Sequence, residues 1–345
     1  MTLTEDLVRP AGAAAPAGAD AQGGRRSNRL GWALAALILL GCVLFVDLDD
    51  IVRTLQRLTP VELVLLVAIA TADRLLMGYK WALLLRIVEV RTPTARVMRF
   101  FYQASFAGSF MPSHVGGDVL RAWWVMRESG VSHPVFASLL VERVLGFAAA
   151  VNWAILGGTV FLCHLSPDHL LVHVVLGLLA AAAANTAFIL LLSAPVHRSV
   201  LRILRSRRES RVISKLHEFG AAFARFGAQP RHLALNALLT VAEQGLQMLL
   251  YLGIAWSIDA VPAVIPFLAA TALFTLVVRL PIAPDGWGVG ELAAIGAYGL
   301  VGVSAAEAFS VSAIGHFVPM VALVPGLVLL LASNRAPAMP PTVSR

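Results

Sequence analysis

Long apolar stretches dominate the chain, and most of them have the length of a membrane-spanning helix. They fall at residues 30–46, 60–86, 136–161, 171–194, 231–256 and 308–332. A helix needs about 20 mostly apolar residues to cross the hydrocarbon core of a bilayer. Two further apolar regions, near 99–126 and 262–303, are interrupted by proline and glycine. The pattern predicts an all-α, polytopic transmembrane helix bundle of about eight spans with one or two re-entrant or broken helices.

Composition supports a membrane protein and argues against a soluble one. Hydrophobic residues make up 58% of the chain and charged residues only 14%, whereas soluble domains are about 25% charged. The net charge of +7 comes from basic residues concentrated in the connections between the spans. We therefore interpret it as a topology signal and a contact for anionic lipid, and we expect no nucleic-acid partner.

The distribution of arginine predicts the orientation. Basic residues gather before the first span, after the second span and in 197–231, while the opposite connections carry few. The positive-inside rule then places both termini in the cytoplasm of a bacterium, with the protein in its inner membrane. Residues 1–29 and 333–345 are expected to be disordered cytoplasmic tails. Residues 200–226 are expected to form a basic amphipathic helix at the membrane interface, or else a solvated helix packed on the bundle.

The same topology suggests how the two broken regions lie. Residues 100–135 begin and end on the cytoplasmic side, which favours a re-entrant hairpin over two crossings. The region 262–303 is either a hairpin from the opposite face or two crossings. Broken elements of this kind surround the substrate sites of many transporters.

Seven charged residues fall inside apolar segments, and each costs about 2.5–3.5 kcal/mol at the bilayer centre. They are Asp73, Arg74, Glu142, Arg143, Glu243, Arg279 and Glu291. We expect them to face one another, the interface or a wet cavity. Arg74 and Arg279 could instead extend to the interface. Asp73 and Arg74 could form an intramembrane pair that is purely structural.

The stretch MPSHVGGDVLRAWW, residues 111–124, places charge where the first broken region turns. Gly116 and Gly117 permit a tight turn with uncovered N–H groups, and Asp118 precedes Arg121 by one helical turn. A helix N-terminus beside an arginine can bind phosphate, and phosphate at membrane depth indicates a lipid headgroup. The alternative is a tight helical hairpin with a capping aspartate and a structural Asp118–Arg121 pair.

The second broken region turns at PIAPDGWGVGE, residues 281–291. Pro281 and Pro284 stop a helix, Gly286 and Gly288 permit close backbone approach, and Glu291 begins the next helix. The segment does not have the spacing of a nucleotide-binding loop, and no Walker motif occurs, so we expect neither an ATP motor nor another cofactor. Histidines near 164–173 are expected to be surface residues, and no metal site is predicted.

Residues 116–147, GGDVLRAWWVMRESGVSHPVFASLLVERVLGF, resemble the signature of the lysylphosphatidylglycerol synthase transmembrane region, also called flippase-like or UPF0104 proteins. Its matching positions include Pro112, Gly116, Gly117, Asp118, Arg121, Glu142 and Arg143. Arg74 with Lys80-Trp81, and 281–291, match more loosely. Asp285 and Gly290 depart from the family pattern, where glycine and arginine are usual. The resemblance spans roughly residues 30–332 and implies a flippase-like domain without the soluble aminoacyl-transferase domain.

These observations predict a protein that moves a phospholipid or a polyprenyl-phosphate-linked headgroup between leaflets. Arg121 and the N–H groups of Gly116 and Gly117 would hold the phosphate, with Arg143 assisting. Proton or counter-charge candidates are Asp118, Glu142 and Glu291. The alternatives are a membrane-embedded transferase in envelope-lipid synthesis, and a scaffold for a synthase partner.

Overall fold

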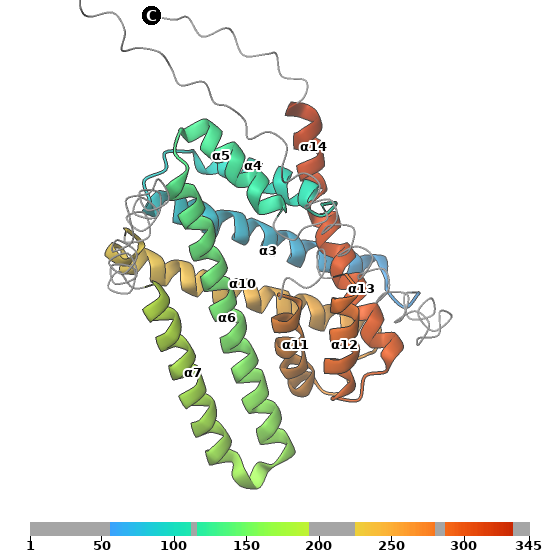
Figure 1. Cartoon of the computed structure of the whole chain (residues 1–345). Coiled ribbons are helices and arrows are strands. Elements are labelled where there is room, and N and C mark those ends of the chain that lie inside the picture. Colours follow the sequence, from blue (N-terminus) through green and yellow to red (C-terminus); the bar gives the residue numbers. More distant parts are fainter. Residues whose placement is uncertain (1–55, 112–115, 193–224, 280–286, 334–345) are drawn as a thin grey trace, which may run out of the picture.

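The computed structural model describes residues 56–111, 116–192, 225–279 and 287–333. The expected tail 1–29, the span 30–46, nearly all of the interfacial helix 200–226 and the tail after 333 lie outside these residues. Within them the fold is all-helical, as predicted (Figure 1).

The described helices follow one another in this order. They are α3 (Pro60–Ile87), α4 (Thr94–Gly108), α5 (Gly116–Ser129), α6 (His133–Leu165), α7 (Leu170–Leu192), α10 (Pro230–Ser257), α11 (Val264–Val278), α12 (Val289–Gly299), α13 (Ala305–Ala322) and α14 (Val324–Ser333). A short 3-10 turn, Pro167–His169, joins α6 to α7. Figure 1 shows α6 and α7 side by side, with α11 to α13 grouped on the other side of α6.

The helix ends follow local sequence signals. Thr59 caps α3 by accepting a hydrogen bond from the Glu62 N–H, and Glu62 bonds back to the Thr59 N–H at 2.8 Å. Ser304 and Glu307 repeat this arrangement at the start of α13. Such reciprocal pairs satisfy N–H groups that a helix leaves without internal partners.

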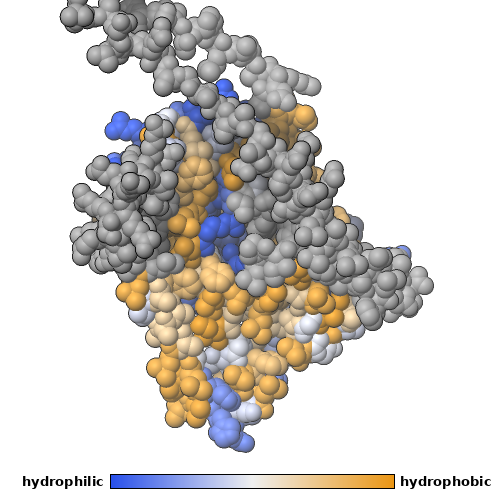
Figure 2. Space-filling view, viewed as in Figure 1, coloured by the Kyte–Doolittle hydropathy of each residue, from blue (hydrophilic) through white to orange (hydrophobic). Residues whose placement is uncertain are grey.

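Four helical segments among the described residues are long and apolar enough to cross a membrane. They are His133–Leu165, Pro167–Leu190, Pro230–Ser257 and Ala305–Ala332. Figure 2 shows hydrophobic residues over much of the visible surface and a patch of hydrophilic residues in its middle. The helices α3, α6, α7 and α10 agree with the predicted spans, whereas the total of about eight remains a prediction.

The predicted last span, 308–332, agrees with the candidate span Ala305–Ala332, which is interrupted at Leu323 between α13 and α14. Pro325 follows two residues later, and a proline within a helix removes a backbone donor and clashes with the preceding turn. A Cβ on Gly326 would lie 2.2 Å from the Tyr102 carbonyl oxygen, so glycine lets α14 approach α4 closely.

Both interrupted regions form pairs of short helices in contact, α4 with α5 and α11 with α12. The four helices have 15, 14, 15 and 11 residues, so none exceeds about 22 Å in length. Each is shorter than the hydrocarbon core of about 30 Å. This geometry confirms broken helices and, for 262–303, favours a hairpin over two crossings.

Glycine residues let α4 and α5 approach each other closely. A Cβ on Gly108 would lie 2.8 Å from the Gly117 Cα, and one on Gly117 would lie 3.0 Å from the Ala104 carbonyl oxygen. Small residues likewise let α6 meet α11, where a Cβ on Gly157 would lie 2.9 Å from the Ala269 carbonyl oxygen. Close backbone contact of this kind is typical of helices packed in membranes.

Candidate functional site

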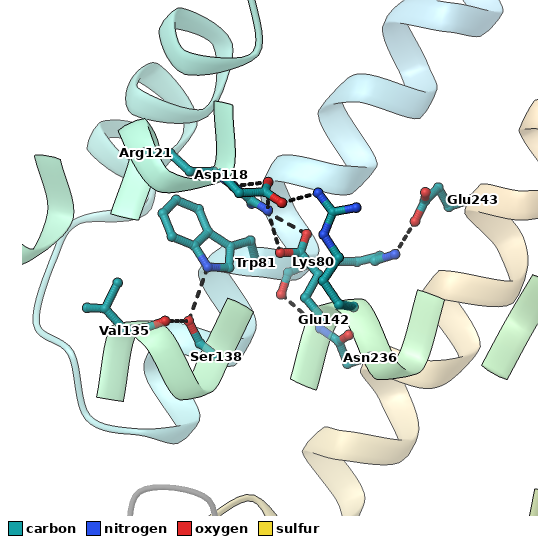
Figure 3. A network of polar contacts seen from close by, with 10 residues as sticks. Lys80, Trp81, Asp118, Arg121, Val135, Ser138, Glu142, Asn236 and Glu243 are labelled. Carbon is teal, nitrogen blue, oxygen red and sulfur yellow. Dashed lines mark hydrogen bonds and ion pairs between the residues drawn. The ribbon is translucent and has the colours of Figure 1, made fainter. Parts of the chain in front are cut away.

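Arg121 lies at the centre of a buried ion cluster that joins α5 to α6. Its Nε and Nη2 donate to Asp118 Oδ1 at 3.0 and 2.7 Å, and Nη2 also donates to Glu142 Oε2 at 2.6 Å (Figure 3). The Arg121 side chain is only 4% exposed. Its guanidinium carbon lies 4.4 Å from the ring centroid of Trp81. Carboxylates and an aromatic face therefore surround this cation.

This arrangement does not favour the predicted contact between Arg121 and a phosphate. All three guanidinium nitrogens face protein carboxylates, since Nη1 also lies 3.4 Å from Glu142 Oε1. Arg121 does not line the adjoining cavity. The geometry matches the structural Asp118–Arg121 pair that the sequence left open as the alternative. Trp81 is held in place by its indole N–H, which donates to Ser138 Oγ at 3.1 Å.

Arg143 follows Glu142 along α6 but points to a different environment. It pairs with the second oxygen of Asp118, and its side chain remains 48% exposed. Asp118 thus bridges a buried arginine and an accessible one. Unlike Arg121, Arg143 lines the cavity described below.

A second buried pair, Lys80 with Glu243, joins α3 to α10. The two side chains are 3% and 8% exposed. Beside them, the Asn236 side-chain amide donates to the Lys80 carbonyl oxygen at 2.8 Å (Figure 3). Glu243 was predicted only as one of the intramembrane charges, and Lys80 only through the family resemblance.

Removing one partner of this second pair should lower the free energy of unfolding more than removing both charges. Lys80→Met leaves Glu243 buried without its cation, a loss typically of about 3–5 kcal/mol. The double variant Lys80→Met/Glu243→Leu should recover most of that loss, because neither ion then needs desolvation. Thermal unfolding of the purified single and double variants measures the coupling. Equal destabilisation by the single and double variants would contradict the pairing.

A polar cavity of about 440 Å³ lies beside the ion cluster, between α3, α4, α5, α6, α10, α11 and α13. Its size falls within the range of small-molecule sites. Its charged lining residues are Arg74, Asp118, Arg143, Glu243, Arg279 and His316. Apolar side chains, including Met77, Phe101 and Phe147, complete the wall. The cavity is thus a charged space inside a bundle with an apolar exterior.

Arg279, which ends α11, lines this cavity and has a neutral partner on α10. With its amide oxygen turned to Arg279, Gln244 accepts hydrogen bonds from the guanidinium, one from Nε at 3.2 Å. A Cβ on Gly146 would lie 3.2 Å from Arg279 Nη1, so glycine leaves room for the guanidinium beside α6. No carboxylate of the described residues forms an ion pair with Arg279. It therefore points into the bundle and does not extend to the interface.

The other cations of this region each have a carboxylate. Arg74 Nη2 lies 2.7 Å from Asp73 Oδ2, which agrees with the predicted intramembrane pair. Lys80 pairs with Glu243, Arg121 with Asp118 and Glu142, and Arg143 with Asp118. Arg279 differs from them because its hydrogen-bond acceptor within the described residues is a neutral amide.

Glu291, on α12, is fully buried and lies behind His316, which lines the cavity. One oxygen accepts from the Gly288 N–H at 2.6 Å, and the other lies 3.2 Å from His316 Nδ1. Trp287 stacks on the His316 ring with centroids 4.6 Å apart. Gly288 has φ +81°, a conformation that favours glycine. Pro281, Pro284, Asp285 and Gly286 lie outside the described residues.

The predicted site residues therefore divide into two groups. Gly117, Asp118 and Arg143 lie at the cavity, while Arg121 and Glu142 form the ion cluster behind it. Sequence reasoning did not identify Arg279 and His316 as parts of one cavity, or Gln244 as the partner of Arg279. Each of them is a polar side chain within an apolar helix. Such a position indicates that the side chain faces inward, but it does not show which residues of other helices it contacts. Among the described residues, no group of His, Cys, Asp and Glu side chains is arranged to hold a metal ion.

Comparisons with known proteins agree with this architecture. The family described as "Lysylphosphatidylglycerol synthase TM region" matches residues 32–326. The chain is 21% identical to a UPF0104 membrane protein of Methanothermobacter thermautotrophicus, over 90% of this chain and 93% of that protein. No solved structure matches the chain.

Proposed function

Because the chain belongs to the family of the lysylphosphatidylglycerol synthase transmembrane region, we propose that it moves an anionic lipid between the leaflets of the membrane. The headgroup passes through the polar cavity while the acyl chains stay in hydrocarbon. The substrate is a phospholipid or a polyprenyl-phosphate-linked lipid. The membrane is the bacterial inner membrane, with both termini in the cytoplasm.

The observation that carries this proposal is that two arginines, Arg143 and Arg279, line the cavity beside the buried ion cluster. Arg279 faces a neutral amide, and Arg143 is accessible from the same space. A charge that lacks a countercharge at membrane depth is costly unless a ligand or water compensates it. A lipid phosphate is an anion that the bilayer itself supplies, and arginine binds it through paired hydrogen bonds.

The roles of the predicted residues change accordingly. The phosphate is bound by Arg279 and Arg143, with Gly117 in the cavity wall and Arg74 nearby. Arg121 and Glu142 act behind this site, as the ion cluster that fixes Asp118 and so the position of Arg143. Glu291 with His316 is the candidate for proton transfer, because His316 lines the cavity and Glu291 lies directly beside it.

Reconstitution tests the function directly. Purified protein is placed in phosphatidylcholine vesicles containing a trace of phosphatidylglycerol with a fluorescent acyl chain, and a membrane-impermeant reductant quenches the outer leaflet. We expect the protein to expose the inner-leaflet fraction to the reductant, and a fluorescent cationic lipid without phosphate to remain protected. Protection of both lipids would contradict the proposal. A modified headgroup, detected by mass spectrometry of the lipid, would support a transferase instead.

A further inference from the structure

The polar cavity has room for more than a phosphate. Its volume is about 440 Å³. At about 30 Å³ for each water-sized group, it holds roughly 15 non-hydrogen atoms, and a phosphate accounts for the smaller part of them. The arginines that we assign to the phosphate line only part of the wall. The rest of the wall therefore bears on what the headgroup carries beyond its phosphate.

The cavity extends along α10 and α11 past Arg279. The Arg279 guanidinium contacts Gln244 on α10. Five residues before Arg279 on α11, Phe274 packs against Tyr251, which lies seven residues beyond Gln244 on α10, with ring centroids 5.0 Å apart. The two helices therefore run in opposite directions here. Cavity residues that lie between these two contacts are on the same side of Arg279.

Neutral polar side chains line this part of the cavity. Gln247 on α10 and Thr275 on α11 belong to it, and Ser105 of α4 lines the same cavity. The Thr275 hydroxyl donates to the Ala272 carbonyl oxygen at 3.0 Å, so it remains an acceptor. Gln247 is half-buried, its amide atoms keep accessible surface, and within the described residues they form no hydrogen bond. Amides and hydroxyls both donate and accept, so this wall is suited to binding hydroxyl groups.

The acidic residues of the cavity are already engaged by cations of the protein. Asp118 accepts from Arg121 and Arg143, and Glu243 pairs with Lys80. Within the described residues, no carboxylate that lines the cavity lacks a cation. A headgroup ammonium would therefore meet arginines without gaining a carboxylate, and like charges at close range repel. The wall thus disfavours a headgroup that carries an amine.

We propose that the lipid carries a neutral polyhydroxyl group beyond its phosphate, either glycerol or a sugar, and that Gln247 hydrogen-bonds to its hydroxyls. Gln247 lies three positions past Gln244 on α10, about 4.5 Å along the helix. A hydroxyl of such a group lies roughly 5 Å from the phosphorus, along bonds of about 1.5 Å. A phosphate bound to Arg279 therefore places a hydroxyl at the level of Gln247. The inference rests on the proposed function and narrows its substrate class.

Exchange of lipids in matched pairs tests the proposal. The full-length protein is reconstituted in phosphatidylcholine vesicles, with the fluorophore on the chain of each lipid. One pair is phosphatidylglycerol and phosphatidic acid, and the other is polyprenyl-phosphate hexose and polyprenyl phosphate. We expect Gln247→Leu to slow the polyol-bearing member of one pair by about 2- to 10-fold, the value of one hydrogen bond, and to leave its phosphate-only counterpart unchanged. The pair that responds identifies glycerol or sugar as the source of the hydroxyls.

The ratio of the two rates within a pair does not depend on how much of a variant is folded. Ser105→Ala should lower the same ratio. Gln56→Leu is the control, because Gln56 is exposed in the turn before α3 and does not line the cavity, and it should leave both ratios unchanged. If Gln247→Leu slowed both members of each pair equally, or slowed neither, the proposal would be overturned.

A headgroup with an amine separates this inference from the proposed function. Phosphatidylethanolamine should exchange at least about tenfold more slowly than phosphatidylglycerol, because its ammonium meets the arginines. Equal exchange of these two lipids would refute the preference for a neutral polyol and leave translocation standing. A protein that exchanges none of the lipids would refute translocation itself.

Discussion

Replacing Arg121 by alanine should destabilise the folded protein by about 3–5 kcal/mol, the usual cost of removing one partner from a buried ion cluster. The change leaves Asp118 and Glu142 without their shared cation, and it removes the guanidinium from the Trp81 face. Thermal unfolding of the purified protein in detergent measures the loss. We expect a marked drop in the unfolding temperature and, as a consequence, weak lipid exchange.

Arg127→Ala is the matched control, because Arg127 lies on the same helix but is exposed over the Trp123 ring. It should leave the unfolding temperature nearly unchanged. The triple variant Arg121→Met/Asp118→Asn/Glu142→Gln should unfold at a higher temperature than Arg121→Ala, because it removes the unpaired charges. An Arg121→Ala protein with normal stability and no lipid exchange would instead assign Arg121 to the headgroup.

Replacing Arg279 by alanine should lower lipid exchange by about 10- to 100-fold. A hydrogen bond to a charged group contributes about 1.5–3 kcal/mol, and each 1.4 kcal/mol is tenfold in an equilibrium constant. Stability should change less than in Arg121→Ala, because Arg279 pairs with a neutral amide and not with a carboxylate. Rates of dithionite quenching in reconstituted vesicles, normalised to the amount of folded protein, measure the effect.

Two further variants control this experiment. Arg279→Lys keeps the charge but loses the planar fork, so it should retain part of the exchange. Arg225→Ala removes an arginine that pairs with exposed Glu89 and does not line the cavity, and it should exchange lipid at the normal rate. Normal exchange by Arg279→Ala would contradict the assignment of Arg279 as the headgroup contact.

Much of the fold could be predicted because a bilayer restricts which sequences can cross it. The spans of α6, α7 and α10 follow from apolar length, and the bounds of α3 agree with the predicted segment 60–86. The break at Leu323 could not be predicted from hydropathy, because the residues on both sides are equally apolar. Its signal was Pro325, and proline is tolerated in many membrane helices when neighbours satisfy the freed backbone groups.

The site was harder to predict than the fold. The sequence indicated that charges such as Arg121 and Glu142 must face inward, but the spacing within one helix cannot show which charges of other helices they meet. Arg121 was placed at the ligand because a glycine turn preceded it. Glu142 lies 21 positions away in sequence, and its carboxylate accepts the hydrogen bond that Arg121 was predicted to give to the ligand. The sequence left the environment of Arg279 open, because an arginine near a helix end can also extend to the interface.

Solid-state NMR of the reconstituted protein can measure the distance between the guanidinium carbon of arginine and lipid phosphorus. If a lipid headgroup binds in the polar cavity, we expect a carbon–phosphorus contact of about 4 Å, as a guanidinium–phosphate hydrogen bond requires. The contact should weaken in Arg279→Lys and persist in Arg225→Ala. Dephasing by phosphorus that is the same in wild type and in Arg279→Lys would show that no lipid phosphate reaches Arg279, and would contradict a headgroup site in the polar cavity.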